Sequence, residues 1–456
     1  MKYKTLIIVA TYSTDGGSEI ILDNLLAGID KEKYNIDILA ITQYSLNVRK
    51  NRDKVRMLSP FAASNSRLYW WKRDALQYIL CNKPQFLSPL FNNIFGNYDI
   101  VIAWAYQQPT LFLISLTNKI KIAWCHNDIN DIISNGNNII NKQLLTAYMK
   151  AYMKAYMNTD IVVTVSNAAG LALSRMFPQI DNKIRVINNP CDAEKIQELA
   201  YHSKQIEIPD HFNKNIILAV GRLDKNKNIE LIIRAVSKSV RSGIECFLII
   251  VGDGNLKNDL VTLVKQEYIE RYVFFTGYVK NPYPYFKIAK VLCLSSFREG
   301  FANVVLEAMT FGIPFVTTPV AGASDELSAN QQCGLISDWN IGDYSECIIK
   351  LLTDDTQYEQ MSKNCIQESK KYSVENFITQ FEDTITGIEN TKDENDSHKT
   401  HFNFYSRFSA ILWYAYAFAT KKTRSKYINN LFIIVFFPLF FFLGFLDGIA
   451  IGAKYK

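Results

Sequence analysis

The sequence lacks the signatures of several common protein classes. None of its eight cysteines forms a Cys-x-x-Cys pair, which excludes a zinc ribbon and a thioredoxin-like redox motif. The 20 glycines and 12 prolines among 456 residues are too few for a collagen-like or linker-dominated chain. Only a short apolar run follows the first four residues, so we expect no secretory signal peptide, reduced cysteines and a cytoplasmic location.

Positive charge is concentrated at one end of the chain. The formal net charge is +6, yet the first 401 residues carry equal numbers of acidic and basic side chains, and the whole surplus lies in residues 402–456. A nucleic-acid-binding protein would carry basic surface across its body, so no nucleic-acid partner is expected. A basic and apolar tail instead indicates an anionic membrane surface.

Up to about residue 390, short continuous runs rich in Ile and Val alternate with helical patterns. Such runs are typical of parallel strands buried on both faces, and strand–helix alternation favours doubly wound α/β domains. The chain length suits two of them. The runs lie at residues 6–10, 36–41, 100–103, 161–165, 216–220, 247–251, 273–276, 291–294 and 315–317.

Composition also predicts the domain boundaries. Asn188-Asn189-Pro190 opens a polar, helical stretch that reaches Lys214, which predicts a hinge there. A second boundary is predicted where the chain becomes wholly polar after residue 390. The predicted segments are an α/β domain at 1–195, a second at 196–390, a polar linker at 391–401 and a membrane-associating tail at 402–456.

The tail contains a continuous apolar run of sixteen uncharged residues at 431–446, with Pro438 in its middle. A helix of this length spans about 24 Å at ~1.5 Å per residue, less than a ~30 Å hydrocarbon core. Aromatic residues at 402–419 and a basic cluster at 421–426 precede it, as in interfacial anchors. Monotopic or re-entrant insertion is the favoured interpretation; a single span and a dimer-interface helix are the alternatives.

The first predicted strand runs into a turn with Gly16 and Gly17, followed by a helix. Glycines at such a turn let the backbone approach a ligand, and the helix start favours an anion. A tight turn with Ser18 as the helix cap explains the pattern equally well.

Two cations follow the predicted strand at 216–220. Arg222 and Lys227 would lie at the carboxyl end of that strand, where open α/β sheets bind ligands. Arg222 could hold a diphosphate through its bidentate fork and Lys227 as a point charge. A solvated basic loop is the alternative.

The sharpest signal is a loop with Glu299 that enters a helix near Ala302 or Asn303 and continues to Glu307. A carboxylate there can accept two hydroxyls of a ribose or sugar, while free N–H groups at the helix start can bind a phosphate. A capped helix with a buried glutamate is the alternative. The residues expected around the phosphate are Gly300, Phe301, Ala302, Asn303 and Val304.

Taken in order, these motifs resemble retaining glycosyltransferases of the GT-B fold, family 4 (glycosyl transferases group 1), of the bacterial capsule, O-antigen and envelope-glycan type. The resemblance spans about residues 5–385 and implies two Rossmann-like domains facing a cleft, followed by the membrane-associated tail. Further matching motifs are Trp124-Cys125-His126, Val165-Ser166, Asn189-Pro190, Gly252-Asp253-Gly254, Phe275-Thr276-Gly277 and the run from Gly312 to Thr318.

The resemblance implies roles for the candidate residues. Arg222 and Lys227 would bind the donor diphosphate and stabilise the leaving group, with the Gly16-Gly17 turn facing it. Glu299 would contact hydroxyls of the donor sugar, and Glu307 the nucleotide ribose.

The resemblance also places His126 near the donor sugar and the reaction centre; a satisfied polar residue after a strand is the alternative. It implies a nucleotide-sugar donor, with UDP favoured over GDP, and no metal or other cofactor. The reaction would add a hexose or N-acetylhexosamine, with retention of the anomeric configuration, to a lipid-linked glycan at the cytoplasmic face of the inner membrane.

Two other functions share much of this pattern. A nucleotide-sugar epimerase can have the GT-B fold, but the paired glutamates with Arg222 and Lys227 at their spacing, and the membrane tail, argue against it. A non-catalytic scaffold for glycan assembly would keep the fold and not the chemistry. Intact Lys227, Glu299 and His126 argue against that interpretation.

Overall fold

The computed structural model describes residues 2–9, 17–40, 56–58, 88–105, 108–126, 142–202, 206, 208–212 and 214–393. Gly16, most of the predicted linker and the predicted tail at 402–456 lie outside these residues. The chain divides into two compact units. Unit 1 takes Met1–Val163, Ser174–Arg185 and the chain from Phe381 onward; unit 2 takes Thr164–Leu173 and Val186–Gln380.

Unit 1 is built on a seven-stranded sheet, counted over the described residues, with the order β3-β2-β1-β4-β5-β6-β7. The pairs from β3 through β5 are parallel. Leu6, Ile7 and Ile8 are fully buried because helices cover both faces of the sheet. The strands are β1 (Tyr3–Val9), β2 (Tyr34–Ala40), β3 (Arg56–Leu58), β4 (Ile100–Ala103), β5 (Ile120–Cys125), β6 (Ile161–Thr164) and β7 (Ile184–Val186).

The described helices of unit 1 come from both ends of the chain. The last described helix, α15 (Val374–Asp393), begins in unit 2 and ends in unit 1, where the Phe381 ring lies 6.1 Å from the ring of Tyr34 and 6.2 Å from that of Trp124. The helix α15 therefore contributes to the core of the first unit. The other helices are α1 (Gly17–Gly28), α3 (Ser88–Phe95), α4 (Gln108–Phe112), α6 (Lys142–Met157) and the end of α7 (Asn167–Met176).

Unit 2 is built on a six-stranded sheet with the order β10-β9-β8-β11-β12-β13. All its strand pairs are parallel, so their carboxyl ends lie along one edge. The strands are β8 (Ile216–Val220), β9 (Phe247–Val251), β10 (Val273–Gly277), β11 (Val291–Leu294), β12 (Phe315–Thr317) and β13 (Gly334–Ile336).

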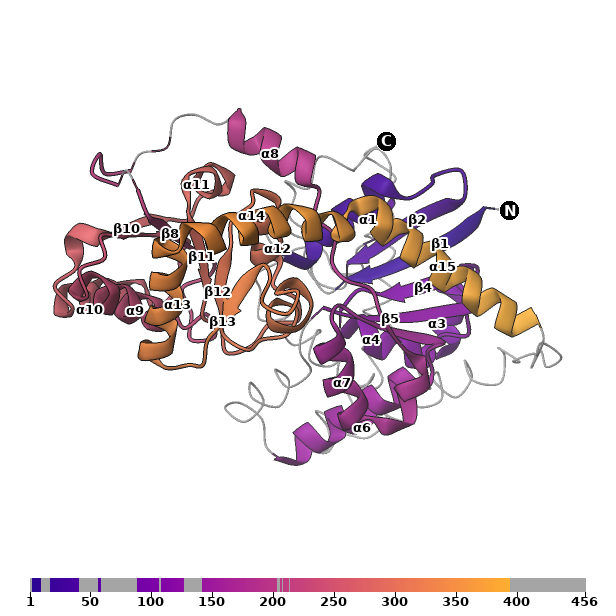
Figure 1. Cartoon of the computed structure of the whole chain (residues 1–456). Helices are drawn as coiled ribbons and strands as arrows, with labels where there is room; N and C mark the ends of the chain where they lie inside the picture. Colours follow the sequence, from indigo (N-terminus) through magenta and orange to yellow (C-terminus); the bar gives the residue numbers. More distant parts are fainter. Residues whose placement is uncertain are drawn as a thin grey trace, which may run out of the picture. The chain divides into compact units, whose positions relative to one another are not determined.

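The helices of unit 2 form two groups around this sheet (Figure 1). One group contains α9 (Ile229–Arg241), α10 (Lys257–Gln266) and α13 (Ile341–Thr353), which pack together. The other contains α8 (Ala193–Tyr201), α11 (Tyr283–Ile288), α12 (Asn303–Thr310) and α14 (Asp355–Ser369). Both units thus have the doubly wound α/β architecture that the alternation of strand and helix patterns predicts.

Local sequence explains where several of these helices begin. Asn340 accepts a hydrogen bond from the Asp343 N–H at the start of α13, and Asp354 accepts one from the Gln357 N–H at the start of α14. Within the described part of the chain, no helix is both long and apolar enough to cross a bilayer.

Candidate functional site

Two loops meet at the carboxyl edge of the unit 2 sheet because β8 and β11 are paired. In the loop after β8, Asp224 Oδ1 accepts hydrogen bonds from the N–H groups of Asn226 and Lys227, at 3.0 and 3.1 Å. This loop passes so close to Gly252 that a Cβ there would lie 1.9 Å from the Gly221 carbonyl oxygen. Gly252 is therefore required by the path of the loop rather than by its own ligand contacts.

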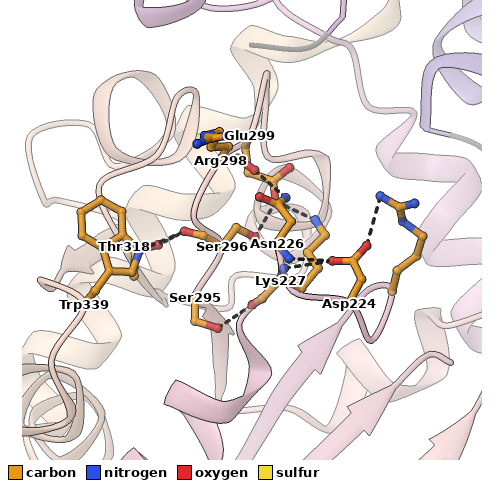
Figure 2. Close-up of polar contacts among 10 residues, drawn as sticks. Asp224, Asn226, Lys227, Ser295, Ser296, Arg298, Glu299, Thr318 and Trp339 are labelled. Atoms are coloured by element: carbon orange, nitrogen blue, oxygen red, sulfur yellow. Dashed lines mark hydrogen bonds and ion pairs between the residues drawn. The ribbon is translucent and has the colours of Figure 1, made fainter. Parts of the chain in front are cut away.

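Lys227 and Glu299 form the centre of the site (Figure 2). The Lys227 Nζ lies 2.6 Å from Glu299 Oε1, and the Ser296 hydroxyl donates to the same oxygen at 2.6 Å. The two charged side chains are only 18% and 15% exposed. Ser295 Oγ fixes the loop by donating to the Lys227 carbonyl at 2.8 Å. The structure thus joins two predicted site residues in one partly buried ion pair.

Arg222 has a different environment. Its side chain is 80% exposed, and it forms an ion pair with Asp224 Oδ2 at 3.3 Å. An exposed guanidinium on the same loop as Lys227 is able to reach a ligand without breaking a buried contact. Both predicted cations have a carboxylate partner, but the Lys227 pair is mostly buried whereas the Arg222 side chain is mostly exposed.

The loop after Glu299 leads directly into α12. The Gly300 carbonyl accepts a hydrogen bond from Ser166 Oγ at 2.8 Å, and this bond holds the loop in place. Within the described residues, the N–H groups of Phe301, Ala302 and Val304 have no acceptor. Free N–H groups at the start of a helix form an anion-binding site.

Asn303 and Glu307 are four residues apart on α12 and so share one face of the helix. Asn303 Oδ1 accepts a hydrogen bond from Asn189 Nδ2 at 2.9 Å. Glu307 is half-buried beside Tyr283, and burial raises the pKa of its carboxyl to about 7, opposed by the hydrogen bond with Tyr283. Burial therefore favours the neutral form of this carboxyl more than in an exposed glutamate.

The predicted residues of unit 1 gather around Trp104. Gly17 opens α1, and Trp104 Nε1 donates to the Ser18 carbonyl at 3.0 Å. The Trp104 ring lies 4.7 Å from the ring of His126, which follows β5. Among the described residues neither imidazole nitrogen of His126 has a partner, and burial lowers its pKa to about 3. Burial therefore favours the neutral form of the His126 imidazole, and both of its nitrogens are buried.

Sequence reasoning missed several residues that shape the site. Ser296 orients Glu299, and Asn226 Nδ2 donates to the Arg298 carbonyl at 2.9 Å, which links the two loops. Tyr283 bonds Glu307 from a separate helix. The position of Ser296 directly after a buried strand was a usable signal, whereas Tyr283 had none. No cluster of acidic, His and Cys side chains suited to a metal occurs among the described residues.

A known protein family matches the part of the chain that contains these candidate residues. Residues 203–370 match the family of glycosyl transferases group 1. This match covers most of unit 2 and includes Arg222, Lys227, Glu299 and Glu307.

The curated relatives are glycosyltransferases. One, from Campylobacter jejuni, is N-acetylgalactosamine-N,N'-diacetylbacillosaminyl-diphospho-undecaprenol 4-alpha-N-acetylgalactosaminyltransferase; it is 26% identical over 289 residues, 63% of this chain and 69% of that protein. Another is an uncharacterized glycosyltransferase from Haemophilus influenzae. It is 25% identical over 368 residues, 80% of this chain and 95% of that protein.

Solved structures extend the likeness to both units. The crystal structure of Anabaena Alr3699/HepE in complex with UDP is similar with a TM-score of 0.62 and 16% identity, over 85% of this chain and all of that one. This likeness shows the fold alone. The two Rossmann-like units thus have the GT-B fold, as the motifs predict.

Proposed function

We propose that this chain is a retaining, family 4 glycosyltransferase that moves a hexose or N-acetylhexosamine from a UDP-sugar to a lipid-linked bacterial surface glycan. The observation that carries the proposal is the arrangement at the carboxyl edge of the unit 2 sheet. There the Lys227–Glu299 pair, the exposed Arg222 and the free N–H groups of α12 lie on adjoining loops. This region also matches the group 1 family.

In this proposal the donor diphosphate binds to Arg222, Lys227 and the start of α12. These groups supply two full positive charges and oriented N–H donors, which suit a diphosphate. Glu299 accepts hydroxyls of the donor sugar, and Glu307 accepts those of the ribose. UDP is favoured because the similar structure from Anabaena was solved with UDP.

The reaction exchanges one bond at the anomeric carbon for another. The bond from that carbon to the diphosphate breaks, and its electron pair leaves with the diphosphate. The acceptor hydroxyl forms the new bond on the same face, and its proton passes to a donor phosphate oxygen. Lys227, Arg222 and the α12 N–H groups stabilise the charge that develops, so the proposal needs no metal ion.

The acceptor is proposed from the relative and the tail together. The relative from Campylobacter jejuni is named for a diphospho-undecaprenol acceptor. Residues 402–456 combine aromatic, basic and apolar segments that suit the cytoplasmic membrane face. An enzyme attached to the membrane would encounter a lipid-linked acceptor by diffusion along the membrane surface. Deleting residues 402–456 should release the protein from vesicles containing anionic phospholipid and reduce transfer to a lipid-linked acceptor more than transfer to a short soluble glycoside.

A transfer assay tests the proposal directly. Membrane fractions containing the chain are incubated with UDP- and GDP-linked hexoses and N-acetylhexosamines, and products are read by mass. Gain of one sugar residue, with the anomeric configuration of the donor by NMR, is the expected result. Lys227→Ala and Glu299→Ala should abolish it while folding is kept. UDP binding without transfer from any donor would favour a scaffold instead.

A further inference from the structure

Two large aromatic side chains lie side by side on the surface of unit 2. Phe297 follows β11 and Trp339 follows β13, and both strands flank β12 in the sheet. Their ring centroids are 6.5 Å apart, with planes inclined by 25°. Phe297 is 49% exposed and Trp339 is 44% exposed. The carboxyl edge of the sheet therefore presents a stacked aromatic pair to solvent, separate from the core.

The aromatic pair is attached to the candidate site through one residue. The Trp339 indole N–H donates to the Ser296 carbonyl oxygen at 3.2 Å, and Thr318 Oγ1 donates to the same oxygen at 2.6 Å. The side chain of Ser296 bonds Glu299. Figure 2 shows Trp339 on the other side of the Ser295–Ser296 segment from Lys227 and Asp224. Ser296 thus holds the carboxylate with its hydroxyl and the indole with its carbonyl.

The polar neighbours of Trp339 identify the kind of ligand. Asp338 and Asn340 adjoin Trp339 in the sequence and are exposed, and Asn340 bonds the exposed Asp343 at the start of α13. Two carboxylates at the rim would be repelled by an anionic membrane or a nucleic acid. Carboxylates and amides are good acceptors for hydroxyl groups. A sugar ring has an apolar C–H face and a hydroxyl edge, which matches an aromatic face with such a rim.

We propose that the Phe297–Trp339 pair is a stacking platform for a pyranose ring of the acceptor glycan. This inference rests on the proposed function and adds an acceptor subsite to it. The donor sugar is assigned to Glu299 and its diphosphate to Lys227 in that function, so a ring stacked on Trp339 is a second sugar. Trp339 bonds Ser296, which in turn bonds Glu299. A ring stacked on Trp339 would therefore lie near the carboxylate proposed to bind the donor sugar, and away from the exposed Arg222.

Saturation-transfer NMR with methyl N-acetyl-α-D-galactosaminide and methyl α-D-glucoside tests the platform on the full chain. Protons of one face of the pyranose should receive the strongest saturation from the protein. Trp339→Ala and Phe297→Ala should each remove this effect. Thr318 still bonds the Ser296 carbonyl in Trp339→Ala, so the carboxylate loop keeps its support. Trp339→Tyr, which retains a ring, should keep most of the effect.

Steady-state kinetics provide a second test of the stacking platform. Trp339→Ala should raise KM for the glycan acceptor about fivefold, the scale of one aromatic contact, with little change in KM for the donor. Tyr268→Ala is the matched control, because Tyr268 is 85% exposed in the same unit and makes no ring pair with another described residue. It should change neither constant.

UDP calorimetry on the same variants separates this inference from the proposed function. Unchanged UDP affinity with lost pyranoside saturation supports the platform. Lower UDP affinity in Trp339→Ala would assign the rings to the nucleotide base and overturn it. Normal UDP binding with no pyranoside saturation in the parent protein would also overturn the platform, and would leave the proposed donor site intact. A parent protein that binds the pyranoside but not UDP would contradict the proposed function instead.

Discussion

The ammonium group of Lys227 lies 2.6 Å from Oε1 of Glu299, although 72 residues separate them in sequence. Both side chains are mostly buried, so their attraction is less screened by water than that of an exposed pair. A donor diphosphate would approach an ammonium that already has a carboxylate partner. In the proposed function, the pair would therefore couple the carboxylate that binds the donor sugar to the cation that binds the diphosphate.

Removing Lys227 should affect activity and stability differently. Lys227→Met should lower the transfer rate by about 10²–10³-fold, the usual cost of one charge-stabilising group. It should also cost about 2 kcal/mol of unfolding free energy, because Glu299 stays partly buried without its cation. Urea unfolding and initial-rate assays measure the two effects.

The double variant Lys227→Met/Glu299→Gln is the control for that prediction. It removes the stranded charge, so part of the lost stability should return while activity stays low. Equal stability of the single and double variants would show that the pair contributes little to folding.

Gly252→Ala should disrupt the loop that carries Arg222. A Cβ at residue 252 would lie 1.9 Å from the Gly221 carbonyl oxygen, and φ of +144° is strained for alanine. The variant should lose about 2 kcal/mol or more of unfolding free energy and bind UDP more weakly.

Gly387→Ala is the matched control. Among the residues that the structure describes, no atom lies within 4 Å of a Cβ at this position in α15, so alanine should stabilise the helix by about 0.5–1 kcal/mol. UDP affinity should stay unchanged. Thermal unfolding and calorimetry of both glycine variants test this contrast.

Glu307 should make the free energy of unfolding decrease as pH rises, which is opposite to the effect of a carboxyl group whose pKa is lowered by folding. Burial raises the pKa of its carboxyl from 4.5 to about 7, so the folded state binds this proton more tightly than the unfolded state. Its contribution is thus most favourable below pH 4.5 and declines as pH rises to about 7. The difference in unfolding free energy between the parent and Glu307→Gln should shift against the parent over this range. A flat difference would contradict the raised pKa.

His126 should act in the opposite sense. Burial lowers its pKa from 6.5 to about 3, so only the unfolded state takes up a proton between these values. Stability from this residue is present above pH 6.5 and is lost as pH falls towards 3. His126→Phe keeps a ring beside Trp104 and removes the titration. Its stability relative to the parent should improve as pH falls from 7 to 4, measured by urea unfolding at each pH.

Local patterns predicted the elements and much of the site. The predicted runs at 216–220, 247–251 and 291–294 coincide with β8, β9 and β11, because continuous Ile, Val and Leu are needed where both faces are buried. The start of α12 near Asn303 was predicted from the loop before it. The strand β13 was missed, because it begins with Gly334 and so contains only two residues of the Ile, Val and Leu type.

Contacts between distant segments could not be predicted in this way. The bond from Trp339 to Ser296 depends on β13 lying beside β12 and β12 beside β11, an order that no local pattern specifies. The same holds for the direct pairing of Lys227 with Glu299. The unpartnered nitrogens of His126 depend on what surrounds a buried ring, which periodicity does not describe.

The helix α15 has a consequence for the order in which the protein can form during synthesis. Phe381, Ile385 and Ile388 of α15 are buried in unit 1, whereas unit 2 is complete at Gln380. Domains usually fold from the N-terminus onward as they leave the ribosome. Here the first unit cannot close its core until α15 emerges, so the second unit is ready to fold first.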